Sequence, residues 1–156
     1  MNFFIDRKES LEKLNRFVEN NLQEYSKLRN FDFGPQKREN TSTLSPFVSH
    51  GVINEAEIIN KVLKKYLFKN SEKFIQEIFW RIYWKGWLEL RPKVWEDYLL
   101  DLEELKEKYK NNLDLINAVS GKTNIKCFNE WVKELEETGY LHNHTRMWFA
   151  SIWIFT

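Results

Sequence analysis

The sequence predicts an all-α protein, and three observations lead to that prediction. Apolar residues recur at spacings of three and four along most of the 156 residues. No stretch alternates apolar and polar residues as a half-buried strand does. The three Pro residues fall between the periodic stretches. A chain of this length buries enough surface for one core, so we expect a single helical domain over residues 1–156.

Residues 74–91 are the stretch around which the prediction is organised, because apolar and aromatic residues surround most of a helix there. A helix of this kind is expected to lie inside a larger core. Glu77, Trp80 and Arg81 then share one face. Two interpretations of that face are open. It holds a Glu77–Arg81 salt bridge within the core, or it forms the wall of a cofactor pocket.

Capping signals place the neighbouring helices. Residues 6–9 and residues 54–57 each have the pattern of a capping box, and the first helix is expected to run to about Tyr25. Ser71 is expected to cap the central helix, and Pro92 to end it.

Towards the C-terminus the same reasoning predicts two more helical regions. Residues 101–110 are charged and are expected to form a solvated helix face. Residues 127–137 return to helical spacing, and Gly139 is expected to stop that helix. Residues 29–46 contain Gly, two Pro and several hydroxyls, so they are predicted to be loop.

Residues 147–155 are apolar on every side of a helix and therefore need neighbours on every side. The chain then stops at Thr156 without a polar last turn. We expect a missing C-terminal segment or an oligomer partner to cover residues 147–155, as in a fragment of a longer protein.

Composition narrows the function classes. Lys and Arg number 24 against 23 Asp and Glu, so no global charge indicates nucleic acid. The one cysteine, Cys127, cannot form an internal disulfide and is expected to be buried; no residue cluster has metal-site spacing. Residues 1–6 are too short and too soon charged for a signal peptide, and no apolar run reaches membrane-spanning length. We expect a cytoplasmic protein without a membrane partner.

Hydroxyl residues concentrate in residues 41–46, just before a predicted helix. Hydroxyls and free backbone N–H groups at a helix start can cradle a phosphate, although an ordinary capping turn has the same composition. No glycine-rich dinucleotide or Walker motif is present, which excludes a Rossmann-type site.

Residues 138–147 form the second polar cluster. If the chain is helical after Gly139, then Asn143, Arg146 and Met147 face one way, and an amide beside a guanidinium can bind a heteroaromatic edge or a phosphate. No nucleophile–base pair is found, so any difficult chemistry is expected to belong to a cofactor.

Together these stretches resemble the helical FAD-binding domain of the photolyase/cryptochrome family. The family's T-S-x-L-S-P motif corresponds to residues 41–46, its N-E-x-x-W-R-E-F-Y motif to residues 76–84, and its T-G-[WY]-M-H-N-R-x-R-M motif to residues 138–147. Residues 121–123 occupy the place of a fourth motif, and Tyr25 matches the family's flavin-phosphate tyrosine. The residues in these motifs resemble those of a divergent bacterial, photolyase-like branch of the family.

The resemblance implies roles for particular residues. The FAD contacts would be Tyr25, Thr41, Ser42, Thr43, Leu44, Ser45, Glu77, Arg81, Asn143 and Arg146. The pocket for a flipped pyrimidine dimer would be formed by Glu77, Trp80, Asn143 and Met147. The implied partner is DNA that contains pyrimidine dimers, and the implied activity is light-driven electron transfer from reduced flavin to a cyclobutane dimer.

The chain departs from the family pattern at several positions. His144 replaces a usual Arg, Ile82 replaces a usual Glu, and Asn129 stands in place of an Asp. The resemblance also implies that an N-terminal α/β antenna domain and the downstream part of the FAD domain are absent. Two other functions remain open: a cryptochrome-like blue-light photosensor without repair activity, and a non-catalytic helical fragment.

Overall fold

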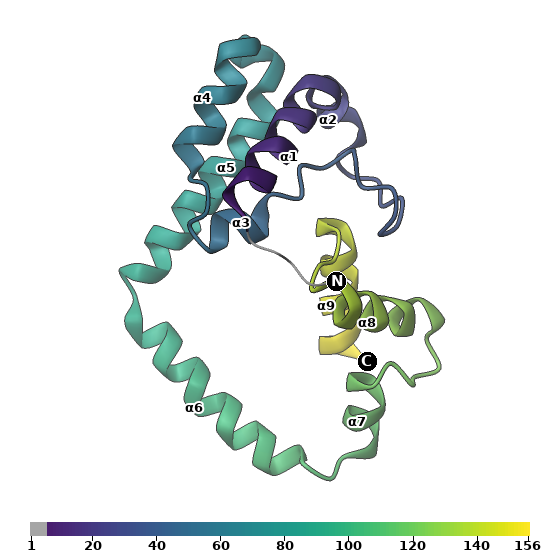
Figure 1. The fold of residues 1–156 in the computed structure, drawn as a ribbon. Helices are drawn as coiled ribbons and strands as arrows, with labels where there is room; N and C mark the ends of the chain where they lie inside the picture. Colours follow the sequence, from purple (N-terminus) through teal and green to yellow (C-terminus); the bar gives the residue numbers. More distant parts are fainter. Residues whose placement is uncertain (1–5) are drawn as a thin grey trace. The chain divides into compact units, whose positions relative to one another are not determined.

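The computed structural model describes residues 6–156, and these residues form nine α-helices and no strand (Figure 1). The predicted all-α fold is confirmed. The described residues divide into two compact units, an N-terminal unit that ends at Lys85 and a C-terminal unit, Gly86–Thr156. The short run of residues 1–5, which we do not interpret as a signal peptide, lies outside the described residues.

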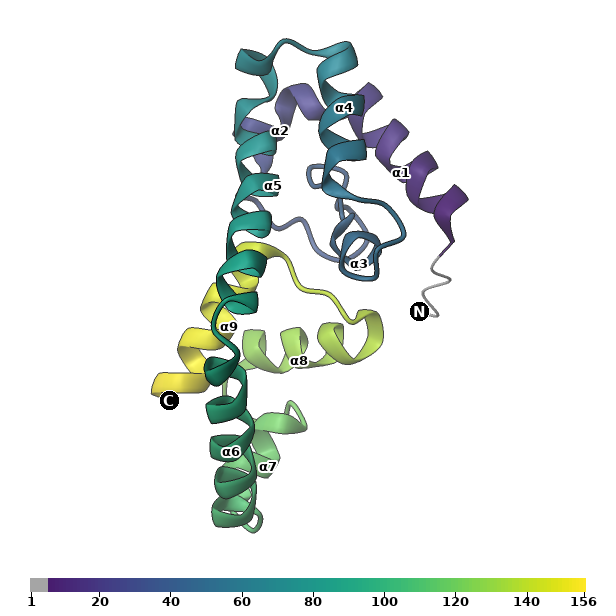
Figure 2. The same ribbon diagram turned by 90° about the vertical axis from the view of Figure 1, so that its left-hand side faces the viewer.

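The N-terminal unit is a small helical bundle. Its elements are α1 (Arg7–Asn20), α2 (Leu22–Leu28), α3 (Ser45–Ser49), α4 (Glu55–Lys65) and α5 (Phe68–Glu89), whose last residues continue past the unit. Figures 1 and 2 show α1 beside α4, and α4 joined to α5 as a hairpin. The predicted loop before α3 is confirmed, although its last two residues already belong to that short helix.

One hydrophobic core holds this unit together because each helix turns an apolar stripe towards it. Phe17 of α1 lies 5.0 Å from Phe74 of α5, measured between ring centroids. The core consists of Leu14, Phe17, Val18, Leu22, Leu44, Phe47, Ile53, Ile58, Val62, Phe74, Ile75 and Ile78.

Two of the predicted helix boundaries are confirmed in detail. The Asn54 side chain accepts a hydrogen bond from the Glu57 N–H at 2.9 Å, and the Glu57 carboxylate accepts one from the Asn54 N–H at 3.0 Å. This is a complete capping box. Asp6 caps α1 through the Lys8 N–H, and the predicted first helix is interrupted at Asn21.

The predictions for the central helix need two corrections. Ser71 does not cap it: α5 begins at Phe68, and the Ser71 hydroxyl donates to the Leu67 carbonyl one turn earlier. The helix is also not buried along its length. Its buried residues are Ser71, Phe74, Ile75 and Ile78, whereas Phe79 is 55% exposed. The predicted end of the helix near Pro92 is confirmed, because α5 ends at Glu89.

The C-terminal unit contains the remaining helices, α6 (Pro92–Tyr109), α7 (Leu113–Val119), α8 (Lys126–Thr138) and α9 (Asn143–Phe155). Gly139 ends α8 with a φ of 65°, as predicted. α6 buries none of its residues, so the solvated face predicted for residues 101–110 is confirmed. Cys127 is exposed, and the prediction that it is buried was wrong.

α8 and α9 pack against each other through aromatic rings. Phe128 stacks on Phe149 at 4.7 Å and on Trp153 at 6.1 Å. Several other apolar side chains of α9 stay open, and Met147 and Phe155 are 62% and 82% exposed. α8 therefore covers one face of the segment for which we expected neighbours on every side.

Candidate functional site

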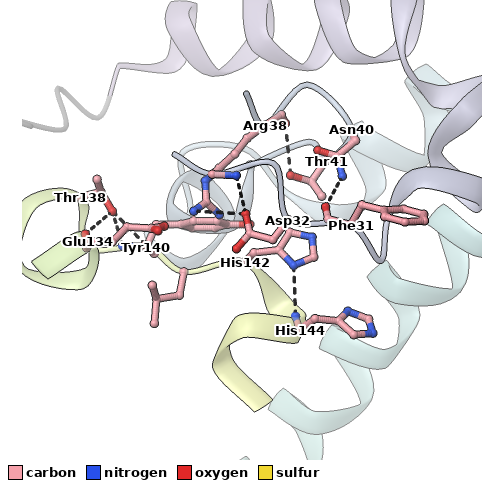
Figure 3. A network of polar contacts seen from close by, with 12 residues as sticks. Phe31, Asp32, Arg38, Asn40, Thr41, Glu134, Thr138, Tyr140, His142 and His144 are labelled. Carbon is pink, nitrogen blue, oxygen red and sulfur yellow. Dashed lines mark hydrogen bonds and ion pairs between the residues drawn. The ribbon is translucent and has the colours of Figure 1, made fainter. Parts of the chain in front are cut away.

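The polar loop that precedes α3 is anchored by one buried amide. The Asn40 side chain donates to the carbonyl oxygens of Leu28 and Phe31, each at 2.8 Å, so the loop is tied to the end of α2 (Figure 3). The Thr41 hydroxyl donates to the Arg38 carbonyl at 3.3 Å. These hydrogen bonds hold in place the first residues of the hydroxyl segment, residues 41–45.

The hydroxyl segment itself combines a buried residue with open polar groups. Leu44 is 3% exposed and belongs to the core, whereas Ser45 is exposed and begins α3. Thr43 has a φ of 48°, a left-handed conformation that a β-branched residue rarely adopts. Within residues 6–156, the hydroxyls of Ser42 and Ser45 make no hydrogen bond.

α3 is a weaker anion site than the sequence suggested. The helix has only five residues, and Pro46 in its first turn has no N–H to donate. The donors that remain for a phosphate are therefore mainly the side-chain hydroxyls of the segment.

Arg81 reaches the same region from α5. Its Nη2 donates to the Ser49 hydroxyl at 3.2 Å, and its Nε lies 3.3 Å from a Glu55 carboxylate oxygen. The guanidinium therefore lies against α3, the helix that Ser45 begins. A guanidinium has five N–H donors, so these two contacts leave donors for an anionic ligand. An anionic ligand bound here would share Arg81 with Glu55.

Glu77 has a partner that the sequence did not indicate. The Arg29 guanidinium donates to it and forms an ion pair with it, and the pKa of Arg29 is raised by that hydrogen bond. The Arg29 and Glu77 side chains are 28% and 45% exposed. The predicted Glu77–Arg81 salt bridge was therefore wrong: Glu77 pairs with Arg29 and Arg81 with Glu55, and neither pair is sealed in the core.

Tyr25 packs against aromatic rings of the core. It contacts Phe17 edge-on at 5.9 Å and Phe74 edge-on at 5.2 Å. It lines a hollow of about 210 Å³ with Ser26 and Lys69 among its neighbours, and no residue of 41–45 lines that hollow. The hydroxyls of residues 41–45 therefore do not belong to this particular hollow.

Trp80 presents an open aromatic surface. Its side chain is 56% exposed and contacts Tyr83 edge-on at 5.8 Å, and Tyr83 contacts Trp84 in the same way at 5.4 Å. Exposed rings of this kind can stack on a flat ligand or on a nucleobase.

The predicted site residues of the C-terminal unit lie in the first turns of α9. The helix begins at Asn143, which confirms that Asn143, Arg146 and Met147 have helical spacing. The buried His142 caps the helix, because its Nδ1 accepts the His144 N–H at 3.2 Å (Figure 3).

Arg146 is held at the start of α9 by two contacts. Its Nε donates to the Leu141 carbonyl at 2.9 Å, and its guanidinium lies 5.1 Å above the Tyr140 ring. Both contacts orient the side chain and leave most of its N–H donors for other partners.

Hydrogen bonds hold the loop of the fourth motif, although its residues depart from the family pattern. Asn129 accepts from the Thr123 hydroxyl at 2.7 Å and donates to the Thr123 carbonyl at 2.8 Å. Gly121 has a φ of 62°, and a Cβ there would lie 3.2 Å from the Asn129 carbonyl oxygen. Asn129 therefore fixes the loop before α8.

Two general features limit the chemistry. Among residues 6–156, no three His, Cys, Asp or Glu side chains gather closely enough to hold a metal ion. No helix in this part of the chain has the length and apolar character required to cross a membrane. The arrangement offers hydroxyls, guanidinium groups and exposed rings, which are binding groups for a phosphate-bearing aromatic ligand.

Comparison with known proteins identifies relatives of one name. The chain is 30% identical over 145 residues to the deoxyribodipyrimidine photo-lyase of Buchnera aphidicola subsp. Baizongia pistaciae. The matched region covers 90% of this chain and 30% of that protein. It is 24% identical over 144 residues to the protein of the same name from Vibrio cholerae, with 89% and 30% covered. The mitochondrial deoxyribodipyrimidine photo-lyase of Saccharomyces cerevisiae is 29% identical over 122 residues, 71% of this chain and 22% of the yeast protein.

These similarities support the photolyase family for this chain. The chain spans about 30% of the length of the curated relatives it matches. No family profile and no solved structure matches the chain.

Proposed function

We propose that this chain is part of a photolyase-like flavoprotein that binds FAD and repairs cyclobutane pyrimidine dimers in DNA. The observation that carries the proposal is the placement of Arg81 against α3, the helix that begins with Ser45, whose hydroxyl makes no hydrogen bond within the described residues. The relatives named deoxyribodipyrimidine photo-lyase support it, because their name gives the substrate as a dipyrimidine of DNA.

In this proposal the N-terminal unit binds the diphosphate of FAD. The Ser42 and Ser45 hydroxyls donate to phosphate oxygens, and Arg81 balances the negative charge. Leu44 anchors the segment in the core, since it is 3% exposed. The remaining FAD contacts proposed from the motifs are Tyr25, Thr41, Thr43, Glu77, Asn143 and Arg146.

The bound flavin would supply one-electron transfer on illumination. The chain's own part is to receive the dimer: Trp80 offers an exposed face for stacking, and Glu77 offers a carboxylate to the pyrimidine edge. Arg29 would hold the Glu77 side chain in place through their ion pair. By the motif resemblance, Asn143 and Met147 are the further residues proposed to contact the lesion.

The experiment is a repair assay with the purified protein, both as this chain and as the full product of its gene. The protein is loaded with FAD, the flavin is reduced, and dimer-containing oligothymidine is illuminated or kept dark. We expect dimers to disappear only in the light, and more slowly in a Glu77→Gln variant. Flavin binding without dimer loss would contradict repair and would favour the photosensor function.

A further inference from the structure

Arg81 carries a buried N–H group that makes no hydrogen bond within residues 6–156. This group is its Nε, although a carboxylate oxygen of Glu55 lies only 3.3 Å from it. The two side chains therefore attract each other as opposite charges, but they are not aligned for a hydrogen bond. A buried donor without an acceptor is unfavourable, so an acceptor with better geometry would be preferred at this position.

The ion pair between Arg81 and Glu55 is only partly buried. The Arg81 side chain is 36% exposed and the Glu55 side chain is 23% exposed. Ion pairs that remain in contact with water contribute little to stability, because water solvates both partners when they separate. A ligand that brings a phosphate to Arg81 can therefore replace Glu55 at a small cost in free energy.

Each member of the pair also has a second source of stabilisation. Glu55 lies in the first turn of α4, where the helix dipole favours a carboxylate. Arg81 donates from its Nη2 to the hydroxyl of Ser49 at 3.2 Å, which holds the guanidinium against α3. Glu55 can therefore leave Arg81 and remain stabilised by α4, while Arg81 keeps its place.

We propose that Glu55 is a displaceable counter-ion of Arg81, and that a ligand phosphate takes its place at the guanidinium. This role rests on the proposed function, which assigns Arg81 to the diphosphate of FAD. Because a carboxylate and a phosphate carry the same sign of charge, Glu55 lowers the affinity of this site for phosphate ligands. Glu55 lies outside all the sequence motifs described above, so it is a further residue that determines ligand affinity.

Isothermal titration calorimetry of this chain with FAD and, separately, with inorganic pyrophosphate tests the proposal. Glu55→Gln keeps the size of the side chain and removes its charge, so the Kd of each ligand should fall about threefold or more. Glu57→Gln is the matched control, because Glu57 lies in the same turn of α4 but pairs with Arg7. It should leave both Kd values unchanged. Circular dichroism checks that both variants keep their helices.

Pyrophosphate has no flavin ring, so its titration separates the role of Glu55 from the proposed function. If FAD binds to neither protein while Glu55→Gln tightens pyrophosphate binding, FAD binding is contradicted and the role of Glu55 is supported. That role is overturned if Glu55→Gln leaves unchanged or raises the Kd of a ligand that binds. It is also overturned by an equal fall in Kd in the two variants, or by failure of pyrophosphate to bind to either the wild type or Glu55→Gln.

Discussion

The two halves of α5 have similar residues and opposite surroundings. Phe74 is 6% exposed in the core of the N-terminal unit, whereas Phe79 and Trp80 are 55% and 56% exposed. The rings that contact Phe74 come from α1 and α2, namely Phe17 and Tyr25, but the ring that contacts Trp80 belongs to Tyr83 of its own helix. Helical spacing therefore marks which residues can be buried, and neighbouring helices decide which ones are.

The two halves of α5 therefore differ in the role that we assign to them. The first half of α5 stabilises the unit, and in our proposal Glu77 and, in the second half, Trp80 and Arg81 bind ligands. Variants of Phe74, Arg81 and Trp80 test this division.

The largest effect is expected for the buried half. Phe74→Ala should lower the free energy of unfolding by about 3–5 kcal/mol, because it removes a packed ring and leaves a cavity. Phe79→Ala is the matched control on the same helix and should change stability by less than about 0.5 kcal/mol. Urea unfolding measures both, and similar losses for the two variants would abolish the distinction between the halves.

Arg81→Ala should act on the ligand rather than on the fold. Loss of one charged hydrogen-bond donor should weaken FAD binding by about 1.5–3 kcal/mol, roughly a 10- to 150-fold rise in Kd. A flavin fluorescence titration measures this, with Arg16→Ala on the exposed side of α1 as the control. An unchanged Kd would remove Arg81 from the proposed phosphate site.

Trp80→Ala should weaken binding to dimer-containing DNA by roughly 1–3 kcal/mol if a base stacks on the ring, while sparing FAD. Phe79→Ala again serves as the control, since Phe79 is equally exposed and adjacent in sequence. Equal DNA affinities of the two variants and the wild type in a fluorescence anisotropy titration would make Trp80 a packing residue.

The smallest effect concerns the ion pair between α1 and α4. The hydrogen bond from Arg7 and the Asn54 N–H hold the pKa of Glu57 below the ordinary value of 4.5. A carboxyl whose pKa is lowered by folding stabilises the protein above its unfolded pKa and loses that contribution as the pH falls through the folded value.

Glu57→Gln should therefore be slightly less stable than the wild type at pH 7, and the difference should vanish in acid, below the ordinary carboxyl pKa of 4.5. Thermal unfolding at several pH values measures the difference. A constant difference down to low pH would mean that Glu57 acts by packing and not by charge.

Local patterns in the sequence predicted much of this fold. The Asn54 capping box, the αL stop at Gly139 and the helix from Asn143 follow from short-range rules and are confirmed. Contacts between distant residues were not predictable in this way. Arg29 and Glu77 are 48 positions apart, and no local spacing announces their ion pair.

The exposure of the second half of α5 was missed for the same reason. An apolar pattern does not reveal which neighbour is present to cover it. For the candidate site, the motifs selected residues whose contacts the structure then specified, such as Arg81 with Ser49 and Glu55.

The most direct test of the flavin proposal is one absorbance spectrum. The purified protein is incubated with FAD, separated from free FAD by gel filtration, and measured. We predict a yellow protein with a flavin band in the visible range and close to one FAD per protein chain. A colourless, folded protein that retains no flavin would contradict it.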